Sequence, residues 1–382
     1  MLVTEFIKRR MCMKENALSK KRLDYLDLAK GIGILIVMLG HFPVDGEPHI
    51  SRQLYDFIFS FHMPLFFIIT GIIFGYNRKW EKQTFKELFI KKLKTIIYPY
   101  FTLSAAALIL QTLEMVFLHF GSPFDLQVTV IRTLTFRGYN ALWYLPALFF
   151  SEIVFFALEK LRVNRFIFVA VTPVITSLLA VYVYPVVWQI GNESTLGNIF
   201  FLVFLYSVRA FLTCVFIYAG FFTYKLLSSD TLDKHPVYVF SAGLLLLTAD
   251  IVLFRFNSSI NVCFLMIGNP FLYYICSFSG SFAVILMCRA FPIKLRLMSF
   301  IGINSLVIMA THNRAPIDFA FYFETLIKKV CSFINFFPPQ LLRLAVVFII
   351  LVVIEIFIVL IINRFMPFVK SFPEFGKNKK SV

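Results

Sequence analysis

Apolar runs alternate with short polar and charged stretches along the whole chain. A helix that crosses a bilayer needs roughly 20 mostly apolar residues. Ten stretches approach that length and predict ten transmembrane helices, at about residues 28–44, 55–76, 96–118, 141–158, 166–186, 197–224, 237–254, 263–288, 299–318 and 341–363. Gly268-Asn269-Pro270 interrupts the eighth, which is either one kinked helix or a loop followed by a shorter helix. The pattern therefore predicts an all-α, polytopic membrane bundle.

The composition agrees with the hydrophobic pattern and excludes a soluble domain. Hydrophobic residues make up 59% of the chain and charged residues only 15%, whereas a soluble domain is about half apolar and a quarter charged. The 49 Phe and 16 Tyr are also too many for a soluble core. The bilayer is therefore the expected environment.

The distribution of Lys and Arg gives the topology. The net charge is +16, and 28 of the 37 Lys and Arg lie on one side of the predicted membrane and seven on the other when the N-terminus is placed inside. Cytoplasmic connections carry such an excess, so we expect both termini to be cytoplasmic. Because the charge is divided among many short loops, no nucleic-acid partner is expected. The predicted parts are a cytoplasmic segment (residues 1–27), a transmembrane domain (residues 28–366) and a basic cytoplasmic tail (residues 367–382).

The cysteines indicate neither a disulfide framework nor a metal site. Cys214, Cys263, Cys276 and Cys288 lie in apolar stretches, and the chain contains no CxxC pair. Two histidines described below lie at similar predicted depth, but no third ligand has convincing spacing. We therefore expect no bound metal and no resident cofactor.

The first predicted span carries three ionisable residues. Asp27 and Lys30 are three apart and share a helix face near the cytoplasm, where an interfacial ion pair is the simplest interpretation. His41 lies eleven residues after Lys30, roughly 16 Å along a helix axis at about 1.5 Å per residue. Lys30 and His41 therefore do not touch, although one long ligand can reach both.

The second predicted span brings another histidine to the depth of His41. His62 is followed by Pro64, which leaves a backbone carbonyl without its helical partner. Such a break is tolerated where polar partners lie nearby. Two histidines at one depth on neighbouring helices predict a polar pocket, in which histidine is suited to act as a general base at neutral pH.

Other polar residues have a structural and a functional interpretation. Lys91, Lys92 and Lys94 form a cationic cluster that suits either lipid headgroups or a phosphate-bearing cytosolic ligand. Trp143 fits an interfacial aromatic belt and is also a candidate supporting residue of the site.

Polar residues also occur within later spans. Arg209 lies within the sixth predicted span and needs a partner or a water-filled cavity. Glu152, Asp250 and Glu355 are its candidate partners by depth. Asn304, Ser305 and His312 lie in the ninth predicted span, where amides and hydroxyls are typical of interhelical hydrogen bonding. Asn304 and His312 are also candidate supporting residues of the site.

Five stretches, in order along the chain, resemble one known family. They are LDLAKGIGILIVMLGH, FSFHMPLFFIITG, KKLKTIIYPY, LWYLPALFFSEI and IGINSLVIMATH. Together they resemble acyltransferase family 3, the ten-span membrane acyltransferases, and within it the fucose 4-O-acetylase-like members. The resemblance covers residues 23 to 366.

The resemblance implies transfer of an acyl group, usually acetyl from acetyl-CoA, to a carbohydrate hydroxyl. The family's first-span signature of arginine, ten residues and histidine matches Lys30 and His41, with lysine in place of arginine. A family pair of arginines three apart matches Lys91 and Lys94, again as lysines. His62 matches the histidine of the family's Phe-His-Met-Pro stretch. Lysine keeps the charge but loses the bidentate fork of arginine.

The resemblance therefore implies a membrane O-acyltransferase in the cell membrane. Lys30, Lys91 and Lys94 would hold the phosphates of acyl-CoA, whose pantetheine arm suits the 16 Å depth estimated above for His41. The acceptor would be a surface polysaccharide or its lipid-linked precursor.

For the chemistry, His41 would act as general base or as a transient acyl carrier, with His62 fixing its tautomer or stabilising an oxyanion. A transporter or flippase for a lipid-linked or anionic solute is the alternative, and a non-catalytic assembly partner is a third reading.

Overall fold

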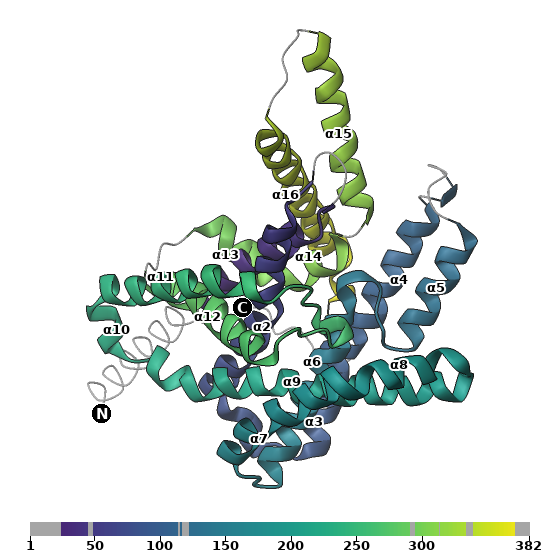
Figure 1. Ribbon diagram of the computed structural model, residues 1–382. Coiled ribbons are helices and arrows are strands. Elements are labelled where there is room, and N and C mark those ends of the chain that lie inside the picture. Colours follow the sequence, from purple (N-terminus) through teal and green to yellow (C-terminus); the bar gives the residue numbers. More distant parts are fainter. Residues whose placement is uncertain are drawn as a thin grey trace, which may run out of the picture.

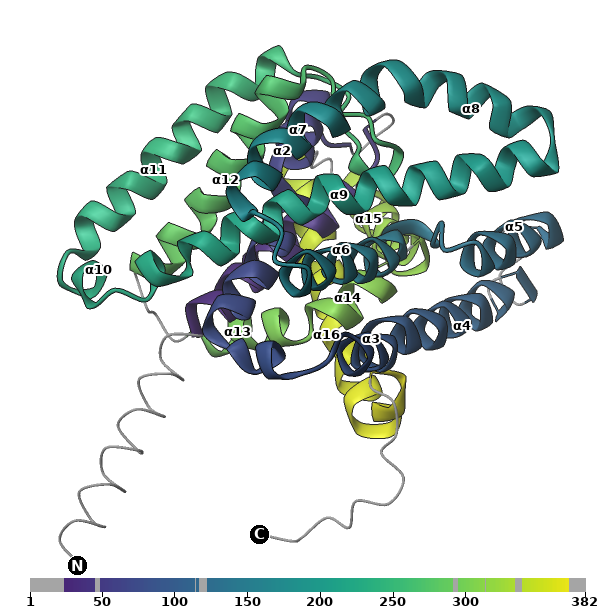
Figure 2. The ribbon, with the colours of Figure 1, turned by 90° about the horizontal axis from the view of Figure 1, so that it is seen from below.

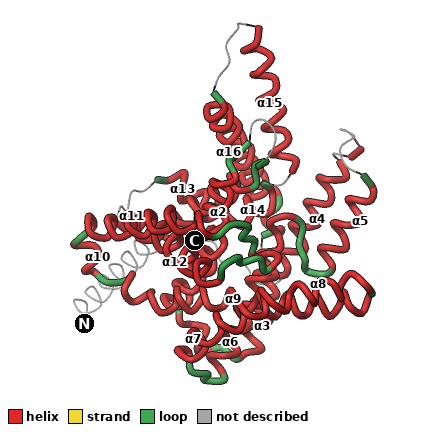
Figure 3. Tube along the Cα trace, viewed as in Figure 1, coloured by secondary structure: helices red, strands yellow, loops and turns green. Residues whose placement is uncertain are grey.

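The computed structural model describes residues 24–44, 49–113, 115–116, 122–290, 295–312, 314–333 and 339–370. Within these ranges the chain is helical apart from its connections, and it contains no strand beyond one isolated bridge between Asn261 and Met266 (Figure 3). The predicted all-α fold is confirmed.

The helices follow one another with few long connections. A first helix covers residues 24–40, and the further helices are α2 (Arg52–Tyr76), α3 (Phe85–Lys92), α4 (Tyr98–Leu113), α5 (Pro123–Leu134), α6 (Tyr144–Lys160), α7 (Arg165–Leu178), α8 (Tyr184–Glu193), α9 (Thr195–Leu227), α10 (Asp230–Lys234), α11 (Pro236–Leu253), α12 (Pro270–Ala290), α13 (Arg296–Ile303), α14 (Ser305–Thr311), α15 (Arg314–Phe333) and α16 (Gln340–Phe365). Short 3-10 or π turns join several of them, among them η2 (Leu93–Ile97) between α3 and α4 and η4 (Asn140–Trp143) before α6.

Eight helical stretches among the described residues are long and apolar enough to span a bilayer, and each overlaps a predicted span. They are Arg52–Tyr76, Phe85–Leu113, Asn140–Lys160, Arg165–Glu193, Thr195–Leu227, Pro236–Phe256, Pro270–Ala290 and Gln340–Phe365. The chain is therefore a polytopic membrane bundle. The count of ten spans and the cytoplasmic placement of both termini stay predictions.

The predicted ninth span, residues 299–318, is wrong as a single helix. The chain leaves helical geometry at Asn304, which separates α13 from α14. The Asn304 side chain donates to the Phe300 carbonyl oxygen at 2.9 Å, and such local bonds of asparagine compete with the helical ladder. A second break follows at His312, before α15 begins.

The interrupted eighth span proves to be a loop followed by a shorter helix. Gly268 adopts a left-handed backbone with φ of 59°, and Pro270 opens α12. The Asn269 side chain accepts hydrogen bonds from the backbone N–H groups of Phe271 and Leu272. This is the usual way of satisfying the first donors of a helix.

Pairs of helices extend from a central cluster. α4 lies beside α5, α8 lies beside the first half of α9, and α15 packs on α16 (Figures 1 and 2). Large apolar side chains are exposed on these arms, for example Phe124 at 70% and Leu341 at 80%. Exposed apolar side chains of this kind fit contact with lipid chains, and a helical backbone suits the bilayer because its hydrogen bonds are made within the segment.

At the centre, α2 and α9 meet backbone to backbone. A Cβ atom on Gly71 would overlap the Ile217 carbonyl oxygen, and a Cβ atom on Gly220 would overlap the Ile68 carbonyl oxygen. Reciprocal glycines allow two membrane helices to approach closely and gain dispersion contacts. This contact fixes α2, and with it His62, against the long helix that carries Arg209.

Gly71→Ala is expected to destabilise the protein by about 1–3 kcal/mol, because the backbone of α9 cannot move aside as a flexible side chain can. The measurement is the unfolding midpoint in mixed detergent micelles titrated with a denaturing detergent. Gly33→Ala is the matched control, since its new methyl group would meet the tip of the Leu65 side chain at 2.9 Å rather than backbone. Equal midpoints for the two variants would contradict the backbone contact.

Candidate functional site

His41 stands at the point where the first helix ends. The helix covers residues 24–40, and Pro43 follows two residues later. The Nδ1 atom of His41 lies 2.8 Å from the Val37 carbonyl oxygen. Because a carbonyl only accepts hydrogen bonds, Nδ1 carries a proton, and in the neutral imidazole Nε2 therefore keeps its lone pair. The tautomer of His41 is thus set by its own helix and not by His62, contrary to one of the roles predicted for His62.

His62, on α2, makes the same kind of hydrogen bond to the carbonyl four residues earlier. Its Nδ1 atom donates to the Ile58 carbonyl oxygen at 2.8 Å, and its ring packs edge-on against Phe59. Two residues later, Pro64 leaves the Ser60 carbonyl without a helical donor, and the Ser277 hydroxyl of α12 donates to it at 2.8 Å. The predicted released carbonyl is therefore present, and it ties α2 to α12 beside the histidine.

A third histidine joins them. His312 follows α14, and its Nδ1 atom donates to the Ile308 carbonyl oxygen at 2.6 Å. Its ring centroid lies 5.0 Å from that of His41, with the planes nearly perpendicular. His312 is 1% exposed, and its Nε2 atom has no hydrogen-bond partner among the described residues. The His312 ring, that of a candidate supporting residue, thus packs against His41.

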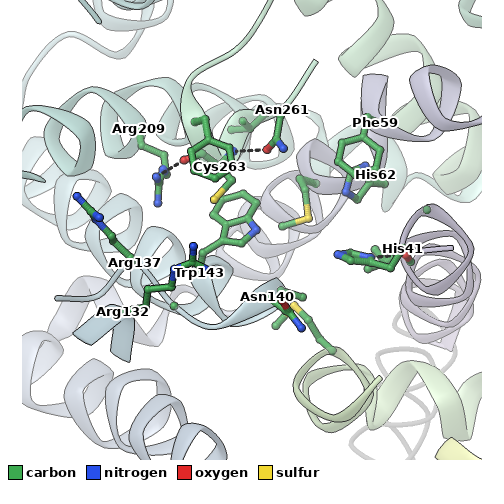
Figure 4. A pocket seen from close by; sticks show the side chains of 18 of the residues that line it. His41, Phe59, His62, Arg132, Arg137, Asn140, Trp143, Arg209, Asn261 and Cys263 are labelled. Atoms are coloured by element: carbon green, nitrogen blue, oxygen red, sulfur yellow. Dashed lines mark hydrogen bonds between the residues drawn. The ribbon is translucent and has the colours of Figure 1, made fainter. Parts of the chain in front are cut away.

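A cavity of about 470 Å³ contains His41 and His62. Its walls come from the first helix, α2, the connection from α5 to α6, the facing parts of α8 and α9, and the loop before α12. Figure 4 shows the histidines at one end and Arg132, Arg137 and Arg209 at the other, with the Trp143 ring between them. Trp143 thus lines the cavity.

His41 also lines a second cavity, of about 400 Å³. This cavity is bounded by α4, α5 and the start of α15, and it contains His312. Arg132 and Asn140 border both cavities together with His41. His41 therefore stands where two spaces of ligand size meet.

The predicted carboxylate partners of Arg209 are wrong. Glu152 pairs with Lys92 at 2.7 Å, Asp250 accepts from Ser60, and Glu355 accepts from Thr311. Residues of similar depth can point into different parts of a bundle, so depth alone did not identify the partner.

Arg209 contacts neutral groups instead. Its guanidinium donates to the Cys263 carbonyl oxygen and lies over the rings of Trp143 and Tyr206, with the centroids 5.2 and 5.7 Å away. The charge is thus held by a carbonyl dipole and two aromatic faces.

The predicted donor-binding lysines lie apart from the histidines. Lys30 pairs with Asp27 at 2.5 Å, which confirms that they share a helix face. Lys91 and Lys94 are exposed on α3 and η2. As far as the described residues show, none of the three lines either cavity that contains His41. The larger cavity contains both histidines, and none of the three lysines lines it among the described residues.

Asn304 belongs to another polar cluster. Its Oδ1 atom accepts from Asn363 at 3.1 Å and from Lys370 at 3.2 Å. This cluster joins α14 to α16 and to the segment after it, so Asn304 does make the interhelical hydrogen bonds predicted for it. Within the described part of the chain, no group of three His, Cys, Asp or Glu side chains is arranged to hold a metal ion.

Some cavity residues were missed by sequence reasoning. Arg132 and Arg137 were counted only as charges of an outer connection, and Asn261 and Cys263 were not assigned to a site. One signal was available in TFRGYNALW, where a glycine and an asparagine stand between apolar runs. There, Phe136, Gly138 and Asn140 adopt left-handed backbone angles, which fold the segment tightly against Trp143.

The comparisons with known proteins agree with this arrangement. No curated protein and no solved structure matches the chain. A family model, that of acyltransferase family 3, described as an acyltransferase domain, matches residues 23–363. The match begins before the first helix and ends within α16, so it includes every residue of the two cavities. This chain of membrane helices around a histidine-lined cavity belongs to acyltransferase family 3.

Proposed function

We propose that the protein is an O-acyltransferase of the cell membrane that moves an acyl group, most simply acetyl, from cytoplasmic acyl-CoA to a hydroxyl of a carbohydrate. The acceptor is a surface polysaccharide or its lipid-linked precursor. Membership of the family supports acyl transfer. The identity of the donor, the identity of the acceptor and the roles of the residues are what we propose. CoA is a co-substrate here and not a resident cofactor.

The observation that carries the proposal is the position of His41. It borders two cavities, and the Val37 carbonyl holds the ring proton on Nδ1. The Nε2 lone pair is then available to a hydroxyl group, which is the requirement for a general base. An acyl transfer also needs two substrates at one base, and two adjoining cavities suit that need.

The reaction balances with His41 alone as the proton carrier. Nε2 takes the proton of the acceptor hydroxyl while the hydroxyl oxygen attacks the thioester carbonyl carbon. The tetrahedral intermediate then breaks its carbon–sulfur bond, and the imidazolium returns the proton to the CoA sulfur. The products are the O-acyl ester and free CoA. His62 and His312 are positioning residues in this account, since each packs beside His41 or its cavity with its own Nδ1 proton fixed.

Lys30, Lys91 and Lys94 would bind the phosphates of the acyl-CoA donor at a distance from His41. Lys91 and Lys94 are exposed, and the Asp27 pair holds Lys30 at the helix end away from His41. Phosphates of CoA at these cations leave the pantetheine arm to cover the roughly 16 Å that separate residues 30 and 41 along a helix.

His41→Ala is expected to lower release of CoA by about a hundredfold or more, because the general base is lost. The measurement uses purified protein in nanodiscs, radiolabelled acetyl-CoA and a panel of surface glycans, with CoA release and label on glycan followed together.

The matched control for this variant is His235→Ala. His235 is an exposed histidine before α11, outside both cavities, and its removal is expected to leave turnover unchanged. Substantial activity in folded His41→Ala protein would refute the assignment of the base. Solute flux without any consumption of acyl-CoA in the wild type would favour the transporter instead.

Replacing Lys91 and Lys94 together by glutamine is expected to raise the KM for acetyl-CoA on the order of threefold to tenfold, with kcat nearly unchanged, because exposed ion pairs with phosphate are weak. The difference in KM between the variant and the wild type should become smaller at high salt, since salt screens exposed charges. Lys79→Gln with Lys82→Gln is the control, as these lysines lie in the neighbouring turn Arg78–Lys82. A fall in kcat without a change in KM would contradict the donor-binding role.

A further inference from the structure

The end of the larger cavity away from the histidines is cationic. Arg132, Arg137 and Arg209 line it, and no Asp or Glu is among the described residues around the cavity. Three guanidinium groups without a carboxylate in the same wall leave a strong positive potential inside a partly enclosed space.

Arg209 is the most unusual of the three. It is 1% exposed, and its Nε and Nη1 atoms have no hydrogen-bond partner among the described residues. Its other terminal nitrogen is bound to the Cys263 carbonyl oxygen. A buried charge is costly unless it is paired, so the two remaining donors suit an anion that arrives from outside the chain.

Arg137 is oriented so that it can bind the same anion as Arg209. Its guanidinium donates to the Asn198 side chain at 2.8 Å and lies over the Phe201 ring, with the centroid 5.6 Å away. Both contacts orient the group without neutralising it. Two oriented guanidinium groups can each donate paired N–H groups to two oxygens of a carboxylate or a phosphate.

The rest of the cavity relates this cationic end to the histidines. The cavity wall carries aromatic surface, from Phe59, Trp143, Trp188 and Phe201. Figure 4 shows Trp143 between the two ends. Aromatic surface beside a few polar groups is typical of sites for organic ligands. A ligand whose anionic group meets the arginines therefore presents its other end to His41 and His62.

We infer that the acceptor is an acidic molecule, one that carries a carboxylate or phosphate group near the hydroxyl that is acylated, and that Arg209 and Arg137 bind this group. The inference rests on the proposed function and narrows its acceptor class. The donor phosphates are assigned elsewhere, because the cavity is lined by predicted outer connections whereas Lys30, Lys91 and Lys94 lie on the predicted cytoplasmic side.

The test compares acidic and neutral acceptors that are otherwise alike. Methyl glucuronide is paired with methyl glucoside, and glucose 6-phosphate with glucose, so that the two pairs separate a carboxylate from a phosphate. Full-length protein in nanodiscs is assayed for binding through its melting temperature and for transfer of radiolabelled acetyl groups.

In the wild type, at least one acidic compound is expected to bind about tenfold or more tightly than its neutral partner, as one or two hydrogen bonds between charged groups predict. Arg209→Gln and Arg137→Gln should abolish this preference, and Arg209→Lys should keep only part of it because the fork is lost. Arg255→Gln, an exposed arginine outside the cavity, is the charge-matched control and should retain the preference.

Each contrary outcome has a definite meaning. Equal binding of every acidic and neutral partner, or an acidic preference that survives in folded Arg137→Gln and Arg209→Gln protein, would overturn the inference. A raised KM for acetyl-CoA in these variants, with no change in acceptor preference, would assign the arginines to the donor and overturn it as well. Arg137 is half-buried, so Arg137→Gln keeps the test valid if Arg209→Gln does not fold. If the wild type releases no CoA in a His41-dependent manner, the proposed function is refuted. The preference for acidic compounds is still tested by the binding measurement, which does not depend on turnover.

Discussion

The need to satisfy every backbone polar group inside a bilayer governs this structure. Within the hydrocarbon region, irregular backbone is tolerated only where protein buries it or where it lines a cavity. Here the first helix stops at residue 40, a tight segment joins α5 to α6, and a loop precedes α12. All three breaks lie on the wall of the larger cavity, which is where chemistry-bearing side chains are found.

The same constraint sets the state of the histidines. His41, His62 and His312 each donate from Nδ1 to the carbonyl four residues earlier, so each ring satisfies its own donor and directs Nε2 away from its helix. His41 relates the three rings to one another. It packs against His312, shares the larger cavity with His62, and lines both cavities. The arrangement requires no metal ion and no carboxylate to define the tautomer.

Much of this was predictable from the sequence, for reasons that differ by residue. His41 and His62 interrupt apolar runs, and a polar residue in an apolar run is costly enough to signal a site. Eight spans followed from the length of their apolar runs. The break at Asn304 did not, because it depends on a side-chain bond to Phe300 that competes with the helix locally.

Other features could not be predicted from the sequence alone, because they depend on how the helices are rotated and packed. Depth placed three carboxylates near Arg209, but rotation about each helix axis sends them to Lys92, Ser60 and Thr311. His312 was a candidate supporting residue, but its contact with His41 could not be predicted because it depends on how α14 ends. Arg132 and Arg137 looked like loop charges, since a count of charges by side of the membrane does not show that a connection folds back into the bundle.

The central proposal is that His41 is the general base for direct transfer of an acyl group from a cytoplasmic donor to a carbohydrate acceptor on the other side of the membrane. The most direct measurement places radiolabelled acetyl-CoA on one side of oriented proteoliposomes and a panel of surface glycans on the other. The account predicts label on glycan across the membrane, with free CoA remaining on the donor side and no transfer by His41→Ala protein. Transfer only when donor and glycan share one side would contradict it.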